Sequence, residues 1–161
     1  MKRYHNYKGK DITVVICAYG KCPYLDESIR AIVSQTIRPN VLISTSTPNN
    51  FITNIAKKYG IEVRINYDGG QIKDYNFAMR QCNTPLGMLA HQDDLLDRRY
   101  IERCLDGLNE AKKPILVCTN YLEMHNNIID SKSSTLIRIK KILIWPIRVK
   151  WIRGTVFGKR M

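Results

Sequence analysis

The stretch L-G-M-L-A-H-Q-D-D-L-L-D, residues 86–97, joins a short apolar run to a group of polar and acidic side chains. The apolar residues 88–90 are too few for a helix and fit a buried β-strand. Such a strand would deliver residues 91–94, H-Q-D-D, to its carboxyl end, where open α/β sheets bind their ligands. The stretch therefore predicts a sheet and also the edge of that sheet at which a ligand would lie.

Two roles fit the adjacent carboxylates Asp93 and Asp94. Neighbouring carboxylates repel each other and lose hydration unless a cation compensates them, which favours a divalent metal ion that carries a phosphate ligand. Asp is also a preferred N-cap residue, so either side chain would serve to start the helix that follows. Taken alone, the two residues leave both interpretations open.

Strands and helices alternate on both sides of this stretch. Residues 12–17, I-T-V-V-I-C, are a β-branched run that predicts a central strand buried on both faces. Further strands are expected at 41–46, 61–66 and 115–121, and helices at about 23–35, 52–59, 72–82 and 98–112. The first of these helices is expected to start at Pro23, and Gly60 is expected to end the second as a C-cap. Strict alternation of this kind predicts an α/β fold in which a mostly parallel sheet lies between two layers of helices.

Length and composition predict a single globular domain in a reducing compartment. The 161 residues are 44% hydrophobic and 25% charged, which is typical of soluble proteins. The five cysteines are odd in number and lack C-x-x-C spacing, so neither a disulfide framework nor a zinc site is indicated. Because no signal peptide or apolar run of about 20 residues is present, we expect a cytoplasmic protein.

The positive charge is concentrated at the end of the chain. Residues 131–161 carry nine Lys and Arg and no acidic residue, whereas the first 130 residues hold 17 basic and 14 acidic ones. We therefore separate a core, residues 1–130, from a basic amphipathic segment, residues 131–161. This segment would pack on the core as an ordinary helix, or bind an anionic membrane surface through Trp145 and Trp151 at the inner face of the membrane. Nucleic acid is not expected as a partner, because no reading motif accompanies the charge.

Several phosphate-binding and hydrolytic motifs are absent. The loop after the first strand, A-Y-G-K-C-P-Y at residues 18–24, is neither a dinucleotide-binding nor a P-loop sequence, and no G-x-S-x-G elbow occurs. Dehydrogenases, P-loop nucleotidases and serine hydrolases are therefore disfavoured. A nucleotide fold remains, with phosphates held by a metal ion on a carboxylate. This favours Asp93 or Asp94 as a metal ligand, with the other as a supporting or capping residue.

Two motifs carry a resemblance to a known family. They are T-V-V-I-C-A-Y-G-K-C-P-Y-L-D-E-S-I-R-A-I-V-S-Q-T at residues 13–36 and H-Q-D-D-L-L-D-R-R-Y-I-E at residues 91–102. With these motifs, the region from about Asp11 to Tyr121 resembles the family 2 glycosyltransferases, which have the GT-A fold. The resemblance implies transfer of a sugar from a nucleotide diphosphate sugar to a glycan or lipid-linked acceptor, for cell-surface polysaccharide, with Mn²⁺ or Mg²⁺ as cofactor.

The resemblance also implies the roles of individual residues. Asp93 falls on the metal-binding position, where the cation would bridge the diphosphate and stabilise the leaving group. The implied donor-binding residues are Ala18 and Tyr19 beside the base and ribose, Gln92 near the ribose, Asp74 and Asn76 facing the nucleotide sugar, and Asp94 beside the metal ligand. For Asp74 the alternative is an ordinary solvated helix residue.

The sequence departs from the family at two positions. The strand at residues 41–46 does not end in the acidic residues that read the base, so a hydroxyl of Thr45 or Ser46 would replace them. His91 occupies the first acidic position of the D-x-D region and would be a metal ligand suited to Mn²⁺ better than to Mg²⁺, or simply a hydrogen-bonded residue at the strand end.

The family's acceptor half and its general base have no counterpart here. After Asp130 the chain has no carboxylate except its own terminus, so no catalytic base is assigned. We therefore expect the nucleotide-sugar half of a glycosyltransferase, truncated or completed by a partner. The alternative is a catalytically incomplete nucleotide-sugar-binding module whose basic segment binds a membrane or a partner protein.

Overall fold

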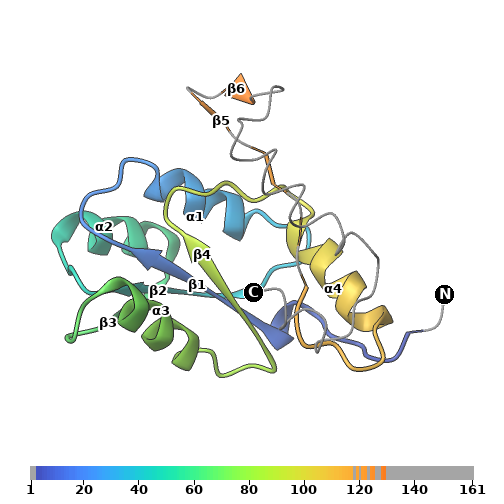
Figure 1. Cartoon of the computed structure of the whole chain (residues 1–161). Helices are drawn as coiled ribbons and strands as arrows, with labels where there is room; N and C mark the ends of the chain where they lie inside the picture. Colours follow the sequence, from blue (N-terminus) through green and yellow to red (C-terminus); the bar gives the residue numbers. More distant parts are fainter. Residues whose placement is uncertain (1–2, 118, 120, 123, 126–127, 130–161) are drawn as a thin grey trace, which may run out of the picture. The chain divides into compact units, whose positions relative to one another are not determined.

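A computed structural model describes residues 3–117, 119, 121–122, 124–125 and 128–129 (Figure 1). The chain divides into two compact units, Met1–Glu110 and Ala111–Met161, and each is considered by itself. The basic segment 131–161 of the sequence analysis lies outside the described residues. Among the described residues, no helix combines the length and the apolarity that crossing a membrane requires.

A four-stranded parallel sheet forms the centre of the first unit, with the strand order β3-β2-β1-β4. The strands are β1 (Ile12–Ala18), β2 (Asn40–Thr45), β3 (Glu62–Ile65) and β4 (Leu86–His91). Strand β1 pairs with β2 on one side and with β4 on the other, and its residues 12–16 are all buried. The predicted central strand is confirmed.

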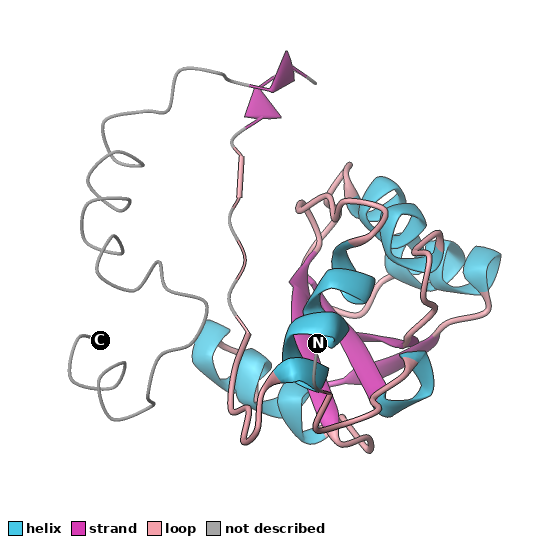
Figure 2. Ribbon diagram, turned by 90° about the vertical axis from the view of Figure 1, so that its right-hand side faces the viewer, coloured by secondary structure: helices cyan, strands magenta, loops and turns pink. Residues whose placement is uncertain are grey.

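Four helices cover the two faces of this sheet: α1 (Leu25–Val33), α2 (Asn50–Tyr59), α3 (Gln71–Arg80) and α4 (Tyr100–Glu110). A short 3-10 turn, η1 (Gly9–Asp11), precedes β1. Figure 1 shows α1 and α2 on one side of the strands and α3 on the other, and Figure 2 shows the strands flanked by helices. This is the expected layered α/β arrangement.

Alternate residues of β1 supply the two layers of the core. Val14 and Ile16 lie in one hydrophobic cluster with residues of α1, α2 and α4, for example Ile29 and Ile101. Val15 points to the opposite face and is fully buried. Burial of each such side chain stabilises the fold by roughly 1.5–3 kcal/mol. The β-branched run of β1 therefore contributes buried side chains to the core on both faces of the sheet.

Helix α2 ends where the sequence indicates. The side chain of Asn49 accepts a hydrogen bond from the Ile52 N–H at 3.1 Å and caps the start of the helix. Gly60 ends it in the left-handed conformation, with φ 64°, as predicted for a C-cap glycine. Helix α1 begins at Leu25, two residues after the proline predicted to start it.

The predicted fifth strand at residues 115–121 is wrong for the residues that the structure describes there. Residues 115–117, 119 and 121 have no regular secondary structure. Ile115 and Leu116 are 87% and 62% exposed, so burial does not favour the extended pairing that their apolar character suggested. The described part of the second unit instead contains two short antiparallel strands, β5 (Met124–His125) paired with β6 (Ile128–Ile129).

Asn109 fastens the N-terminal segment to α4. Its side-chain oxygen accepts a hydrogen bond from the Tyr7 N–H at 2.7 Å, and its amide donates to the Tyr7 carbonyl at 3.1 Å. Its own carbonyl accepts from the N–H groups of Tyr4 and His5. The side chain is 3% exposed, so water cannot replace these bonds. One buried amide thus joins the two ends of the first unit.

We expect Asn109→Ala to lower the free energy of unfolding by about 1–3 kcal/mol, because it leaves two backbone groups of Tyr7 without partners. Urea denaturation followed by circular dichroism measures the loss. Asn54→Ala is the matched control, since Asn54 is an exposed helical residue of α2 and should change stability by about 0.5 kcal/mol or less. Equal losses in the two variants would contradict this role.

Candidate active site

The carboxyl ends of the parallel strands meet at one edge of the sheet. In the strand register Ala18 of β1 lies opposite Thr45 of β2, and Cys17 of β1 lies opposite His91 of β4. The loops that leave these strands therefore start side by side. Among the described residues, this edge brings together most of the site residues predicted from the sequence.

The loop between β1 and α1 is held by side chains from its neighbours. The Tyr19 N–H donates to Oε1 of Gln92 at 2.8 Å, and the Gly20 N–H donates to Oγ1 of Thr47 at 2.7 Å. Asn49 donates its amide to the Gly20 carbonyl at 2.9 Å. Phosphate-binding loops use free backbone N–H groups at this position of the fold. Here the first two are occupied, so a diphosphate needs another source of positive charge.

Asp74 reaches this edge from the first turn of α3. Its Oδ2 accepts a hydrogen bond from the Ser46 hydroxyl at 2.8 Å, and its Oδ1 accepts from the Asn66 amide at 2.7 Å. Burial, and secondarily the negative charge of Asp74, raises the pKa of the Cys17 thiol to about 11. The carboxylate therefore faces the end of β1 as well as the ends of β2 and β3, and it is more than a solvated helix residue.

Asp93 and Asp94 occupy the turn that follows β4, and both are exposed. Among the described residues, neither carboxylate has a hydrogen-bond or ion-pair partner, so their oxygens are available to a ligand. In this part of the chain no group of three or more His, Cys, Asp and Glu could enclose a metal ion. The donor set fits a cation that takes one or two carboxylates from the protein and its other ligands from phosphate and water.

The remaining predicted residues are placed as follows. The side chain of Ala18 is buried, so only its backbone can face a nucleotide. Thr45 is 2% exposed, and its Oγ1 accepts a hydrogen bond from the Thr47 N–H at 3.0 Å. His91 is exposed and packs edge-on against the ring of Tyr75, with centroids 5.5 Å apart.

Asn76 is not brought together with the other predicted residues. Two residues along a helix are about 200° apart around its axis, so Asn76 lies on the side of α3 opposite to Asp74. Its side chain is exposed. The helix period, applied to the two residues, would have shown that both cannot face one ligand.

Side chains of α1 and its C-terminal turn anchor the acidic turn and the loop behind it. The buried Ser28 hydroxyl donates to the His91 carbonyl at 3.1 Å. The Gln35 amide donates to the Asp97 carbonyl at 2.7 Å, while its oxygen accepts from the Ile101 N–H at 3.0 Å. The chain is therefore attached to α1 and its C-terminal turn both before and after Asp93 and Asp94.

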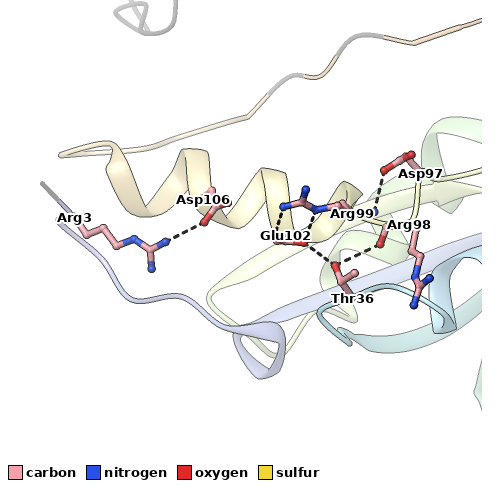
Figure 3. A network of polar contacts seen from close by, with 7 residues as sticks. All are labelled: Arg3, Thr36, Asp97, Arg98, Arg99, Glu102 and Asp106. Carbon is pink, nitrogen blue, oxygen red and sulfur yellow. Dashed lines mark hydrogen bonds and ion pairs between the residues drawn. The ribbon is translucent and has the colours of Figure 1, made fainter. Parts of the chain in front are cut away.

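The proposed capping role of Asp93 or Asp94 is wrong. Helix α4 begins only at Tyr100, and in the turn before it Asp97 accepts a hydrogen bond from the Arg99 N–H at 2.9 Å. Figure 3 shows this contact beside an ion pair in which Glu102 accepts from Arg99 at 2.7 and 3.0 Å and from the Thr36 hydroxyl at 2.9 Å. Because α4 starts well beyond Asp93 and Asp94, these two carboxylates are left for another role.

Asn66 and Thr47 also lie at this edge, although neither was among the residues predicted from the sequence. Asn66 directly follows β3 and is 6% exposed, and Thr47 follows the end of β2. Both are polar residues just beyond the carboxyl end of a strand, which is the signal that identified residues 91–94. The same rule, applied to every strand, would have found them.

Comparison with known proteins agrees with this geometry. The model of the family described as Glycosyl transferase family 2 matches residues 13–159. The chain belongs to this family. The resemblance seen in residues 13–36 and 91–102 is therefore confirmed, and the chain carries a glycosyltransferase-like domain. No curated protein matches the chain significantly.

Solved structures show that this family 2 domain has a GT-A-like fold. The crystal structure of S. aureus TarS superposes with a TM-score of 0.53 at 16% identity, covering 62% of this chain and 20% of TarS. The structure of S. aureus TarS 1-349 gives the same TM-score at 15% identity and covers 62% and 32%. The chain thus spans a third or less of the TarS chains it matches.

The ion pair of Glu102 makes a prediction for acid stability. Hydrogen bonds from Arg99 and Thr36 lower the pKa of Glu102 from 4.5 to about 2. Because the folded pKa is the lower one, the ion pair contributes stability that is present above pH 4.5 and is lost as the pH falls toward 2. We expect Glu102→Gln to be less stable than wild type at neutral pH and equally stable near pH 2.

Urea unfolding across this pH range measures the difference. Glu27→Gln is the control, because Glu27 makes a single ion-pair contact with Arg30 at 3.9 Å. A stability gap for Glu102→Gln that did not shrink on acidification would show that the Glu102 ion pair does not set the acid response.

Proposed function

We propose that this family 2 domain binds a nucleotide diphosphate sugar in a metal-dependent manner and serves its transfer to a glycan or lipid-linked acceptor. The observation that carries the proposal is the edge where β1, β2 and β4 end. There the exposed carboxylates of Asp93 and Asp94 lie beside a loop whose first two N–H groups are already hydrogen-bonded. A diphosphate would be repelled by these acids unless a divalent cation lay between them.

Each group at the edge has a role in this proposal. Asp93 holds Mn²⁺ or Mg²⁺, with His91 as a further ligand and Asp94 as a supporting acid. The cation, when bound, neutralises the charge that develops on the diphosphate leaving group. Tyr19 and the backbone of Ala18 lie along the base and ribose. Gln92 fixes that loop through its bond to the Tyr19 N–H, which sets the distance between the nucleotide and the metal ligand.

The proposed location of the protein is the cytoplasm, at the inner face of the membrane. The cysteines described by the structure, Cys17, Cys22, Cys82 and Cys104, are all free thiols, which agrees with the reducing cytoplasm. Peripheral attachment to the inner face of the membrane through residues 131–161 would bring the domain to a lipid-linked acceptor or to cell-surface polysaccharide precursors.

We expect Asp93→Asn to abolish Mn²⁺-dependent binding of nucleoside diphosphates, because it removes a charged ligand from the cation. Calorimetry with UDP, GDP, dTDP and CDP, with and without MnCl₂, measures this. Asp68→Asn is the matched control: Asp68 is an exposed acid of the loop after β3 and should leave binding within about twofold of wild type.

Two results would count against the proposal. One is the failure of all four nucleotides to bind wild type in the presence of Mn²⁺. The other is binding by Asp93→Asn as tight as that of wild type, with the same dependence on the metal ion.

A further inference from the structure

Polar residues at the ends of β2 and β3 are organised around Asp74. Ser46 follows β2, Asn66 follows β3, and both donate hydrogen bonds to the same carboxylate, at 2.8 and 2.7 Å. Asn66 is held in turn, because its backbone N–H donates to the Thr45 carbonyl and its Oδ1 accepts from the Asp68 N–H at 3.3 Å. The carboxylate therefore has a fixed orientation rather than a free rotamer.

Asp74 still has capacity for a ligand. A carboxylate has about four acceptor positions, and each oxygen of Asp74 accepts one hydrogen bond within the described residues. The side chain is half-buried, so it is not fully solvated but is still accessible to a ligand. An ionised carboxylate only accepts hydrogen bonds and cannot donate one. Whatever meets its free positions must therefore present N–H or O–H groups.

The hydroxyls expected to read the base are already in use. Thr45 is buried and accepts from the Thr47 N–H, while the hydroxyl hydrogen of Ser46 is directed to Asp74. Ser46 cannot donate to a base without giving up its bond to Asp74, and Thr45 is buried, so its hydroxyl is shielded from a ligand. At the ends of β2 and β3, Asp74 is thus a charged acceptor held in place by hydrogen bonds, and it is supplied by helix α3 rather than by a strand.

We propose that Asp74 is the specificity-determining residue for the nucleobase, and that it selects a base with a hydrogen on a ring nitrogen. Uracil and thymine carry this hydrogen on N3, and guanine carries it on N1 beside a donating amino group. Cytosine and adenine present a ring nitrogen lone pair there, which a carboxylate repels, and offer it only the hydrogen of the neighbouring amino group. This inference rests on the proposed function and deepens it, because it names the class of donor as a uridine, thymidine or guanosine diphosphate sugar.

Calorimetry on the full chain in MnCl₂ tests the selection directly. We expect UDP, dTDP or GDP to bind about tenfold or more tightly than CDP and ADP. The reason is that a base whose lone pair faces a charged hydrogen-bond acceptor loses at least that much binding affinity. This ranking uses wild-type protein only. If CDP or ADP bound as tightly as the best of the other three, the inference would be wrong while the proposed function stood.

Asp74→Asn then tests the residue. The new amide can accept from Asn66 and donate to the Ser46 oxygen, so the local bonds are conserved. It can also donate to the N3 lone pair of cytosine and accept from its amino group. We expect the affinity for CDP relative to UDP to rise about tenfold, with melting temperature and metal dependence unchanged.

Three outcomes separate this inference from its alternatives. A uniform loss of affinity for all five nucleotides in Asp74→Asn would show that Asp74 does not read the base. An equal change of the CDP to UDP ratio in Asp68→Asn would attribute the shift to general charge, and would also overturn the inference. Failure of wild type to bind any of the five would remove the proposed function together with it.

Discussion

The pairing of β1 with β2 and β4 is the constraint on which the rest of the first unit depends. The three strands are parallel, and their register places Ala18 opposite Thr45 and Cys17 opposite His91. Their carboxyl ends therefore meet at one edge of the sheet. The same strand is buried on both faces, so the helices on either side are attached through it. Core packing and the position of the site therefore have one origin.

The edge is held together mainly by polar side chains that bond to backbone groups of other loops. Gln92 binds the loop after β1, Ser28 binds the end of β4, and Gln35 binds the loop before α4. Each of these bonds joins segments that are more than 60 residues apart in sequence. Rigid anchoring of this kind positions a ligand without using the carboxylates of Asp93 and Asp94, in the turn after β4, as structural hydrogen-bond acceptors. Asp93 and Asp94 remain available to a ligand because Gln92, Ser28 and Gln35 make the hydrogen bonds that hold the loops.

Charge is the reason for proposing that this glycosyltransferase-like domain depends on a cation. A P-loop uses free N–H groups and a Lys to hold phosphate, whereas here the N–H groups of Tyr19 and Gly20 are bonded to Gln92 and Thr47. The same edge carries Asp74 near the end of β1 and the two acids after β4. The acids separate into two groups with different partners: Asp74 is hydrogen-bonded by protein, and Asp93 and Asp94 are exposed. That separation underlies the distinct roles proposed for base recognition and metal binding.

The sequence by itself determined the alternation of strands and helices, the buried run at residues 12–17, the C-cap at Gly60 and the family, because these depend on local propensity and on side-chain periodicity. Only the tertiary structure decided which polar residues meet. It brought Ser46, Asn66 and Asp74 together from three elements, separated Asn76 from them, started α4 well beyond Asp93 and Asp94, and left residues 115–117 without a strand. Hydrogen bonds between distant loops depend on strand register and helix rotation, and a linear pattern does not specify these quantities.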